Sequence, residues 1–178
     1  NTLLGGSFTS RLNDNLREQH GYTYGARSYF DYRLTAGLFG AAADVQTKVT
    51  GEAMTEFLKE LERIQTPATP REVERARTYM ALRLPQELET TDQLAAELAN
   101  QALHSLPDDF FGTYVGQTLA VTPEALRKAA KANVDTSKMA YVVVGDRATV
   151  QKPLEALKLG PVRVLTVEEV MGPAPKLE

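Results

Sequence analysis

The sequence has no cysteine, no tryptophan and only two histidines among its 178 residues. Without cysteine, the chain can form neither disulfides nor thiolate-ligated metal sites. The two histidines, His20 and His104, lie too far apart to form an HxxEH or HExxH pair. We therefore expect no zinc or other catalytic metal site, and no cofactor, within this chain.

The sequence also lacks clusters of charge of a single sign and long apolar runs. The chain has 20 Lys+Arg and 23 Asp+Glu, with both signs interspersed. A nucleic-acid-binding chain usually carries a clustered basic face, and a membrane span needs about 18 or more apolar residues. We expect neither a nucleic-acid partner nor a membrane span. Because the sequence starts at Asn1 without a signal-like segment, we expect it to be cropped from a longer protein.

The N-terminal region predicts two helices and a hairpin. Residues 1–4 resemble the end of a helix that Gly5-Gly6 stops, and a second helix is expected from Ser7 or Thr9 to about His20. Its apolar stripe is Phe8, Leu12 and Leu16. From residue 22 the period changes to two, which predicts an antiparallel hairpin with arms 22–32 and 37–46. In this pattern Tyr24 shares a face with the alternate residues up to 32.

The remainder is predicted to be mostly helical. Helices are expected to start at Thr50, at the capping box Thr69-Pro70-Arg71-Glu72, near 91, at 107 and at 122, and Pro85 is expected to interrupt the second of them. The apolar run 139–145 predicts a central strand covered on both faces. A helix over 149–157 and a strand over 162–167 follow.

These elements predict an α+β fold with two layers, in which helices pack on one face of an antiparallel or mixed sheet. We expect a single domain over residues 1–172. Residues 173–178 are expected to be a disordered tail or a cloning remnant.

The stretch LGGSFTSRLNDNLREQHGYTYG closely resembles the C-terminal homology domain of pitrilysin-type (M16) zinc metallopeptidases. The resemblance continues through Ala43-Asp44-Val45-Gln46-Thr47, the helix start at Thr69, Val121-Thr122-Pro123 and the VVVGD run that ends at Asp146. It implies the LuxS/MPP-like form of the predicted fold. It also implies that the first strand of the domain precedes Asn1.

The resemblance further implies a half-enzyme from a bacterial metallopeptidase. Zinc would be held by HxxEH in an N-terminal domain or a partner subunit, and this chain alone would be inactive. Carried over to this sequence, the substrate-binding or oxyanion-stabilising pair is Arg17 with Tyr22 or Tyr24, with Arg11 as an alternative cation. An arginine can hold a carbonyl or carboxylate, and a phenol can donate to a developing oxyanion.

Simpler interpretations of these residues remain open. Arg17 could complement a helix C-terminus, the tyrosines could pack on a half-buried strand, and His20 could be an ordinary helix-end residue. At the level of the protein, the alternatives are a structural or assembly subunit of the same family and a stand-alone peptide-binding module. A homodimer or heterodimer is compatible with each. The sequence leaves the compartment open, with the periplasm slightly favoured over the cytoplasm.

Overall fold

The computed structural model describes residues 1–173, and residues 174–178 of the tail expected over 173–178 lie outside this range. No helix in residues 1–173 is long and apolar enough to cross a bilayer. The elements in chain order are η1 (Thr2–Gly6), α1 (Arg11–Asn13), η2 (Asp14–Gln19), β1 (Thr23–Asp31), β2 (Leu38–Val45), η3 (Thr47–Val49), α2 (Thr50–Arg63), α3 (Pro70–Glu87), α4 (Thr91–Leu103), α5 (Phe110–Ala120), α6 (Pro123–Asn133), η4 (Thr136–Lys138), α7 (Arg147–Ala156) and α8 (Val167–Met171).

Strands β1 and β2 form the predicted antiparallel hairpin. Ala26 lies opposite Ala43 and Phe30 lies opposite Phe39. The register shifts between Thr23 and Ala26, which marks a β-bulge at the start of β1. The expected shared face is present for Ala26, Ser28 and Phe30, which are buried or pack against the core, but it is wrong for Tyr24, which lies in the bulge and is exposed.

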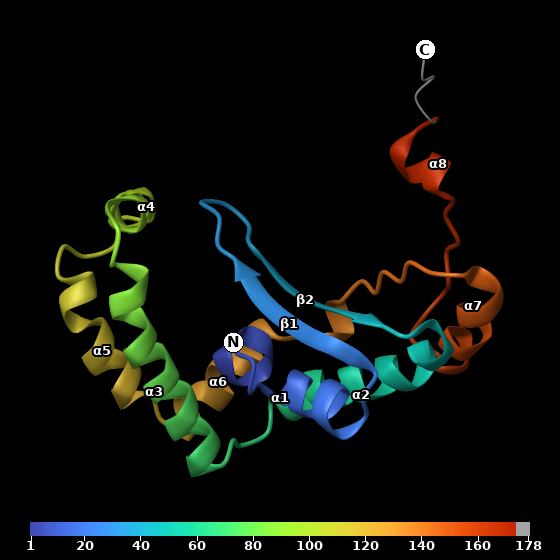
Figure 1. Cartoon of the computed structure of the whole chain (residues 1–178), viewed down its shortest axis with the longest axis horizontal. Helices are drawn as coiled ribbons and strands as arrows, with labels where there is room; N and C mark the ends of the chain where they lie inside the picture. Colours follow the sequence, from blue (N-terminus) through green and yellow to red (C-terminus); the bar gives the residue numbers. More distant parts are fainter. Residues whose placement is uncertain (174–178) are drawn as a thin grey trace.

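The core lies between one face of the hairpin and the helices below it in Figure 1. Leu12 and Leu16 of the α1–η2 segment are fully buried, as their spacing predicts, whereas Phe8 is largely exposed and does not join their stripe. This arrangement confirms the α+β fold with helices packed on one face. The other buried apolar residues of the cluster are Leu3, Leu4, Ala26, Ala53, Leu61, Ile64, Ala68, Val73, Ala130 and Val134.

The close contact between η1 and β1 explains Gly5. A Cβ at this position would lie 2.5 Å from the Ser28 backbone nitrogen. Gly5 is buried inside η1, and the helix ends after Gly6. The glycine is thus required by the approach of β1 and not, as the sequence suggested, by a left-handed stop.

Helices α3, α4 and α5 form a lobe at the end of the molecule away from α7 (Figure 1). The capping box predicted at Thr69 and Glu72 is present. The expected break at Pro85 is wrong, since α3 continues to Glu87. Only the last turn follows the proline, so few helical hydrogen bonds depend on the missing N–H.

Two predicted strands are absent from residues 1–173. The segment 139–145 is extended but forms no sheet pairing, and Val142 and Val144 are 84% and 93% exposed. Residues 162–166 are likewise unpaired, and Val167 already begins α8. An apolar run adopts a strand only when another strand offers hydrogen-bonding partners, and neither segment finds one among the described residues.

Candidate functional site

Arg17 lies in η2 with its guanidinium above an exposed aromatic ring. Its Cζ atom is 4.2 Å from the centroid of the Phe8 ring, a cation–π contact. Its Nη1 atom lies 3.0 Å from Glu18 Oε1, yet this nitrogen makes no hydrogen bond. Within residues 1–173 the guanidinium therefore lies between Phe8 and Glu18, with its Nη1 atom buried and the side chain as a whole partly exposed.

Tyr24 lies in the β-bulge and points into solvent. The side chain is 99% exposed. Thr23 stabilises the bulge: its Oγ1 donates to the Asp44 carbonyl at 2.6 Å and accepts from the Gly25 N–H at 3.1 Å. The bulge re-aims the tyrosine away from the face that covers the core.

Tyr22 has a different environment, although it is only two residues away. Its ring stacks on His20 with centroids 4.9 Å apart, and it packs against the core. Its backbone N–H donates to the Leu16 carbonyl at 2.8 Å. The structure thus separates two tyrosines that strand parity alone could not distinguish.

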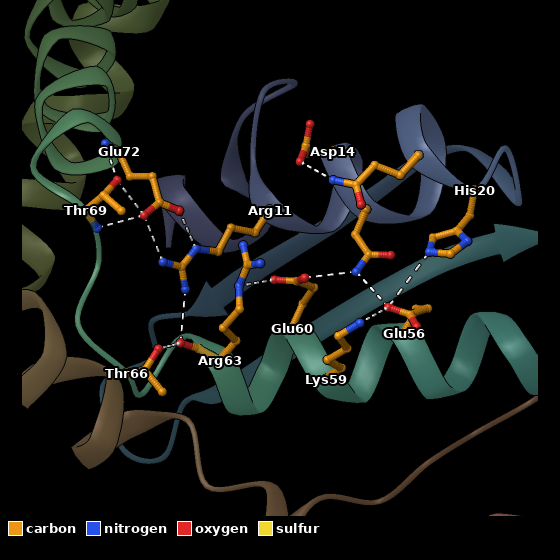
Figure 2. A network of polar contacts seen from close by, with 12 residues as sticks. Arg11, Asp14, His20, Glu56, Lys59, Glu60, Arg63, Thr66, Thr69 and Glu72 are labelled. Carbon is orange, nitrogen blue, oxygen red and sulfur yellow. Dashed lines mark hydrogen bonds and ion pairs between the residues drawn. The ribbon is translucent and has the colours of Figure 1, made fainter.

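Arg11, the alternative cation, is committed to a structural ion pair (Figure 2). Its Nε and Nη2 atoms donate to the two carboxylate oxygens of Glu72 at 2.7 and 3.1 Å, and Nη1 donates to the Arg63 carbonyl at 3.0 Å. The hydrogen bond from this guanidinium holds the pKa of Glu72 at about 2. Because Arg11 is buried and its donors are used, it has no free group for a substrate.

A second polar group anchors the η2 segment that carries Arg17. Asn15 Nδ2 donates to Glu56 Oε2 and to Glu60 Oε1, both at 2.9 Å. Glu56 also accepts from Lys59 at 3.0 Å and lies 3.9 Å from His20 Nε2 (Figure 2). The hydrogen bond from Asn15 is the main cause of the lowered pKa of Glu56. His20, at the C-terminal end of η2, lies beside the Glu56 carboxylate.

Asn13 is a positioning residue that sequence reasoning missed. Its Nδ2 donates to the Ala26 carbonyl at 2.9 Å, and its Oδ1 accepts from the Ala26 N–H at 2.8 Å. The side chain thus pairs with β1 as a neighbouring strand would, directly after the bulge. The only sign of this in the sequence was the position of Asn13, in a predicted helix close to the first predicted strand.

The chain offers no metal centre in the part that the structure describes. Residues 1–173 contain no group of three or more His, Cys, Asp or Glu side chains that could hold a metal ion. Asn15 donates to Glu56, and Glu56 faces His20, as Figure 2 shows for the latter pair.

The family of the N-terminal region follows from its sequence together with this fold. Residues 1–80, which include Arg17, both tyrosines and the hairpin, match the family model described as "Peptidase M16 inactive domain". This region belongs to the M16 inactive-domain family. The resemblance seen in the first twenty residues is thereby confirmed.

Several solved structures share the fold of this chain. The peptidase M16 inactive domain from Pseudomonas fluorescens has a TM-score of 0.68 at 21% identity, covering 76% of this chain and 32% of that chain. A protease from Helicobacter pylori has a TM-score of 0.64 at 20% identity, covering 74% and 32%. A chain of complex III2 from Candida albicans has a TM-score of 0.61 at 16% identity, covering 70% and 30%.

The chain spans about a third of the length of the solved chains that it resembles. No match was found among curated proteins. At these identities the solved structures establish the fold of the chain, which is that of M16 inactive domains.

Proposed function

We propose that this chain is the non-zinc half of an M16-type metallopeptidase and contributes Arg17 and Tyr24 to peptide binding. A zinc-bearing domain or subunit would supply the metal and the attacking water. Arg17 would hold a carbonyl or carboxylate of the peptide, and the Tyr24 phenol would donate to the oxyanion that forms during amide hydrolysis. Alone, the chain would not hydrolyse peptides.

The observation that carries this proposal is the contrast in exposure between Arg11 and Arg17 and between Tyr22 and Tyr24. Arg11 is buried and donates to Glu72 and Arg63, whereas Arg17 is partly exposed, lies on the Phe8 ring and pairs with the exposed Glu18. Tyr22 is half-buried on His20, whereas Tyr24 is exposed. An exposed phenol and an oriented guanidinium suit a site completed by another domain.

The experiment measures hydrolysis of a quenched fluorogenic peptide by the assembled protein, which contains this chain and its zinc-bearing part. The variants are Arg17→Ala and Tyr24→Phe, with Arg127→Ala as the control because Arg127 is an exposed arginine on α6. Loss of one oxyanion donor typically lowers kcat by about 10²–10³. We expect a fall of this order for Tyr24→Phe and a large fall in kcat/KM for Arg17→Ala, with no change for Arg127→Ala.

Two results would contradict the proposal. The first is chelator-sensitive hydrolysis by the isolated chain after zinc is added. The second is equal activity of the Arg17→Ala and Arg127→Ala variants in the assembled protein.

A structural or assembly role is the second candidate. It is favoured by the similarity of the fold to a chain of complex III2 from Candida albicans. The two candidates differ in the partner that co-purifies with the chain. A partner with an HxxEH motif supports the peptidase role, whereas partners without it, together with a silent Arg17→Ala variant, support assembly.

A further inference from the structure

A groove of about 780 Å³ lies between one face of α3 and the segment that joins α1 to η2. Arg11, Asp14 and Arg63 line one side of it, and Figure 2 shows these residues beside Glu72. The α3 side is lined by Arg71, Glu72, Glu74, Arg75, Thr78, Tyr79 and Leu82. We call this space the arginine groove.

Most charged side chains of the arginine groove already have a partner. The contacts are Arg11–Glu72 at 2.7 Å, Arg63–Glu60 at 3.0 Å, Arg77–Glu74 at 3.9 Å and Gln19–Asp14 at 2.8 Å. Arg71 and Arg75 differ, because both are exposed and neither belongs to an ion pair within residues 1–173. They lie one helical turn apart on α3. The α3 side of the groove therefore presents two positive charges that no carboxylate of the described chain neutralises.

The arginine groove changes from charged to apolar along α3. Tyr79 lies one turn after Arg75 and Leu82 lies nearly two turns after it, so the three share a face of the helix. Tyr79 and Leu82 are 40% and 70% exposed. A partner that fits this surface carries a carboxylate next to apolar side chains.

Helix α8 has this composition. Val167, Val170 and Met171 have the spacing of one helix face and are 77%, 63% and 78% exposed. Glu168 flanks this face, is exposed and belongs to no ion pair in the described part of the chain, whereas Glu169 is used by the helix cap. Figure 1 shows α8 in red beyond α7, at the end of the molecule away from α3.

We propose that the arginine groove binds α8 of a second copy of this chain. Glu168 pairs with Arg75, and the apolar face of α8 covers Tyr79 and Leu82. The two surfaces lie at opposite ends of one molecule, so the contact forms between molecules (Figure 1). Because they are unlike surfaces, two copies can exchange the contact reciprocally. The contact uses neither site residue of the proposed peptide-binding role and is independent of it.

The size of α8 sets the strength of this association. A helix of five residues covers much less area than a standard protein interface, so a single contact is weak. The pair between Glu168 and Arg75 lies at the surface, where salt screens it. We therefore expect self-association that depends on concentration and weakens as the ionic strength rises.

The experiment measures sedimentation velocity of the 178-residue chain over about a hundredfold range of concentration. The variants are Arg75→Glu and Glu168→Arg, with Arg127→Glu and Glu155→Arg as controls because these exposed residues lie on α6 and α7, outside the groove. We expect each of the first two to weaken self-association at least about tenfold and each control to change it less than about twofold. Since all four side chains are exposed, the far-UV circular dichroism should not change.

A mixture of the two variants tests the pairing directly. Arg75→Glu places a carboxylate in the groove, and Glu168→Arg places a guanidinium on α8. Each variant alone brings like charges together, whereas a complex of one with the other has opposite charges at both contacts. We expect the equimolar mixture to associate within about twofold of the wild type.

Three results would overturn the inference. The first is a wild type that stays monomeric over the whole range; if Arg75→Glu then abolishes binding of the zinc-bearing part, the groove belongs to that partner. The second is an equal effect of the groove variants and their controls, which places self-association on another surface. The third is a mixture that associates no better than either variant alone, which shows that residues 75 and 168 do not face each other.

Discussion

Arg11 and Glu72 form a two-point ion pair across 61 positions of sequence, joining the α1 segment to the first turn of α3. The same carboxylate accepts from the Thr69 backbone N–H at 2.8 Å and from its hydroxyl at 2.9 Å. One side chain thus completes a helix cap and neutralises a buried arginine. This relationship connects the M16 hairpin region to the helical lobe.

Acid should weaken the fold through Glu72. Its pKa is lowered to about 2 in the folded chain from an ordinary value of 4.5, so the folded state favours the carboxylate. The resulting stability is present above about pH 4.5 and is lost as the pH falls toward 2, by the order of 2–3 kcal/mol. Urea unfolding of the wild type and Glu72→Gln should differ by about this amount at pH 7 and converge near pH 2. A constant difference across this range would contradict the assignment.

Tyr22 and Tyr24 should differ in their effect on stability. Tyr22→Ala removes a ring that packs on His20 and the core, so we expect a loss of about 1–3 kcal/mol. Tyr24→Ala removes an exposed side chain and should change the free energy of unfolding by less than about 0.5 kcal/mol. Chemical denaturation of the isolated chain measures both. A larger loss for Tyr24→Ala would place this ring in the fold and not at an interface.

Two glycine-to-alanine changes should have opposite signs. In Gly5→Ala the new methyl group meets the Ser28 backbone nitrogen at 2.5 Å, so η1 or β1 must shift, at a cost of about 1–3 kcal/mol. In Gly112→Ala the methyl group meets nothing within 4 Å inside α5, and the helix should gain about 0.5–1 kcal/mol. Thermal unfolding of the two variants checks this. Destabilisation by both would show that the space around Gly112 is occupied.

Features that depend on neighbouring residues were predictable from the sequence. The capping box at Thr69 and Glu72 was found because its partners are three residues apart, and Leu12 and Leu16 were found because one helical turn separates them. The hairpin arms followed from the period of two. Arg17 and the tyrosines were selected through the family resemblance, and their role remains a prediction.

Features that depend on distant partners were not predictable. The position of Tyr24 is set by a bulge that Thr23 stabilises through the Asp44 carbonyl, 21 residues away. The role of Arg11 depends on Glu72, which local spacing cannot reveal. The run 139–145 has the composition of a central strand, but pairing requires a neighbouring strand that residues 1–173 do not supply.

The lobe of α3, α4 and α5 has a consequence for the dynamics of the domain. Val73 is the buried residue of α3, Thr118 is that of α5, and α4 has none. A segment with so little buried surface opens at a lower free energy than the core around Leu12 and Leu16. Hydrogen exchange should therefore divide the chain into a fast-exchanging helical unit and a slow-exchanging unit around the hairpin, with the Arg11–Glu72 contact at the boundary between them.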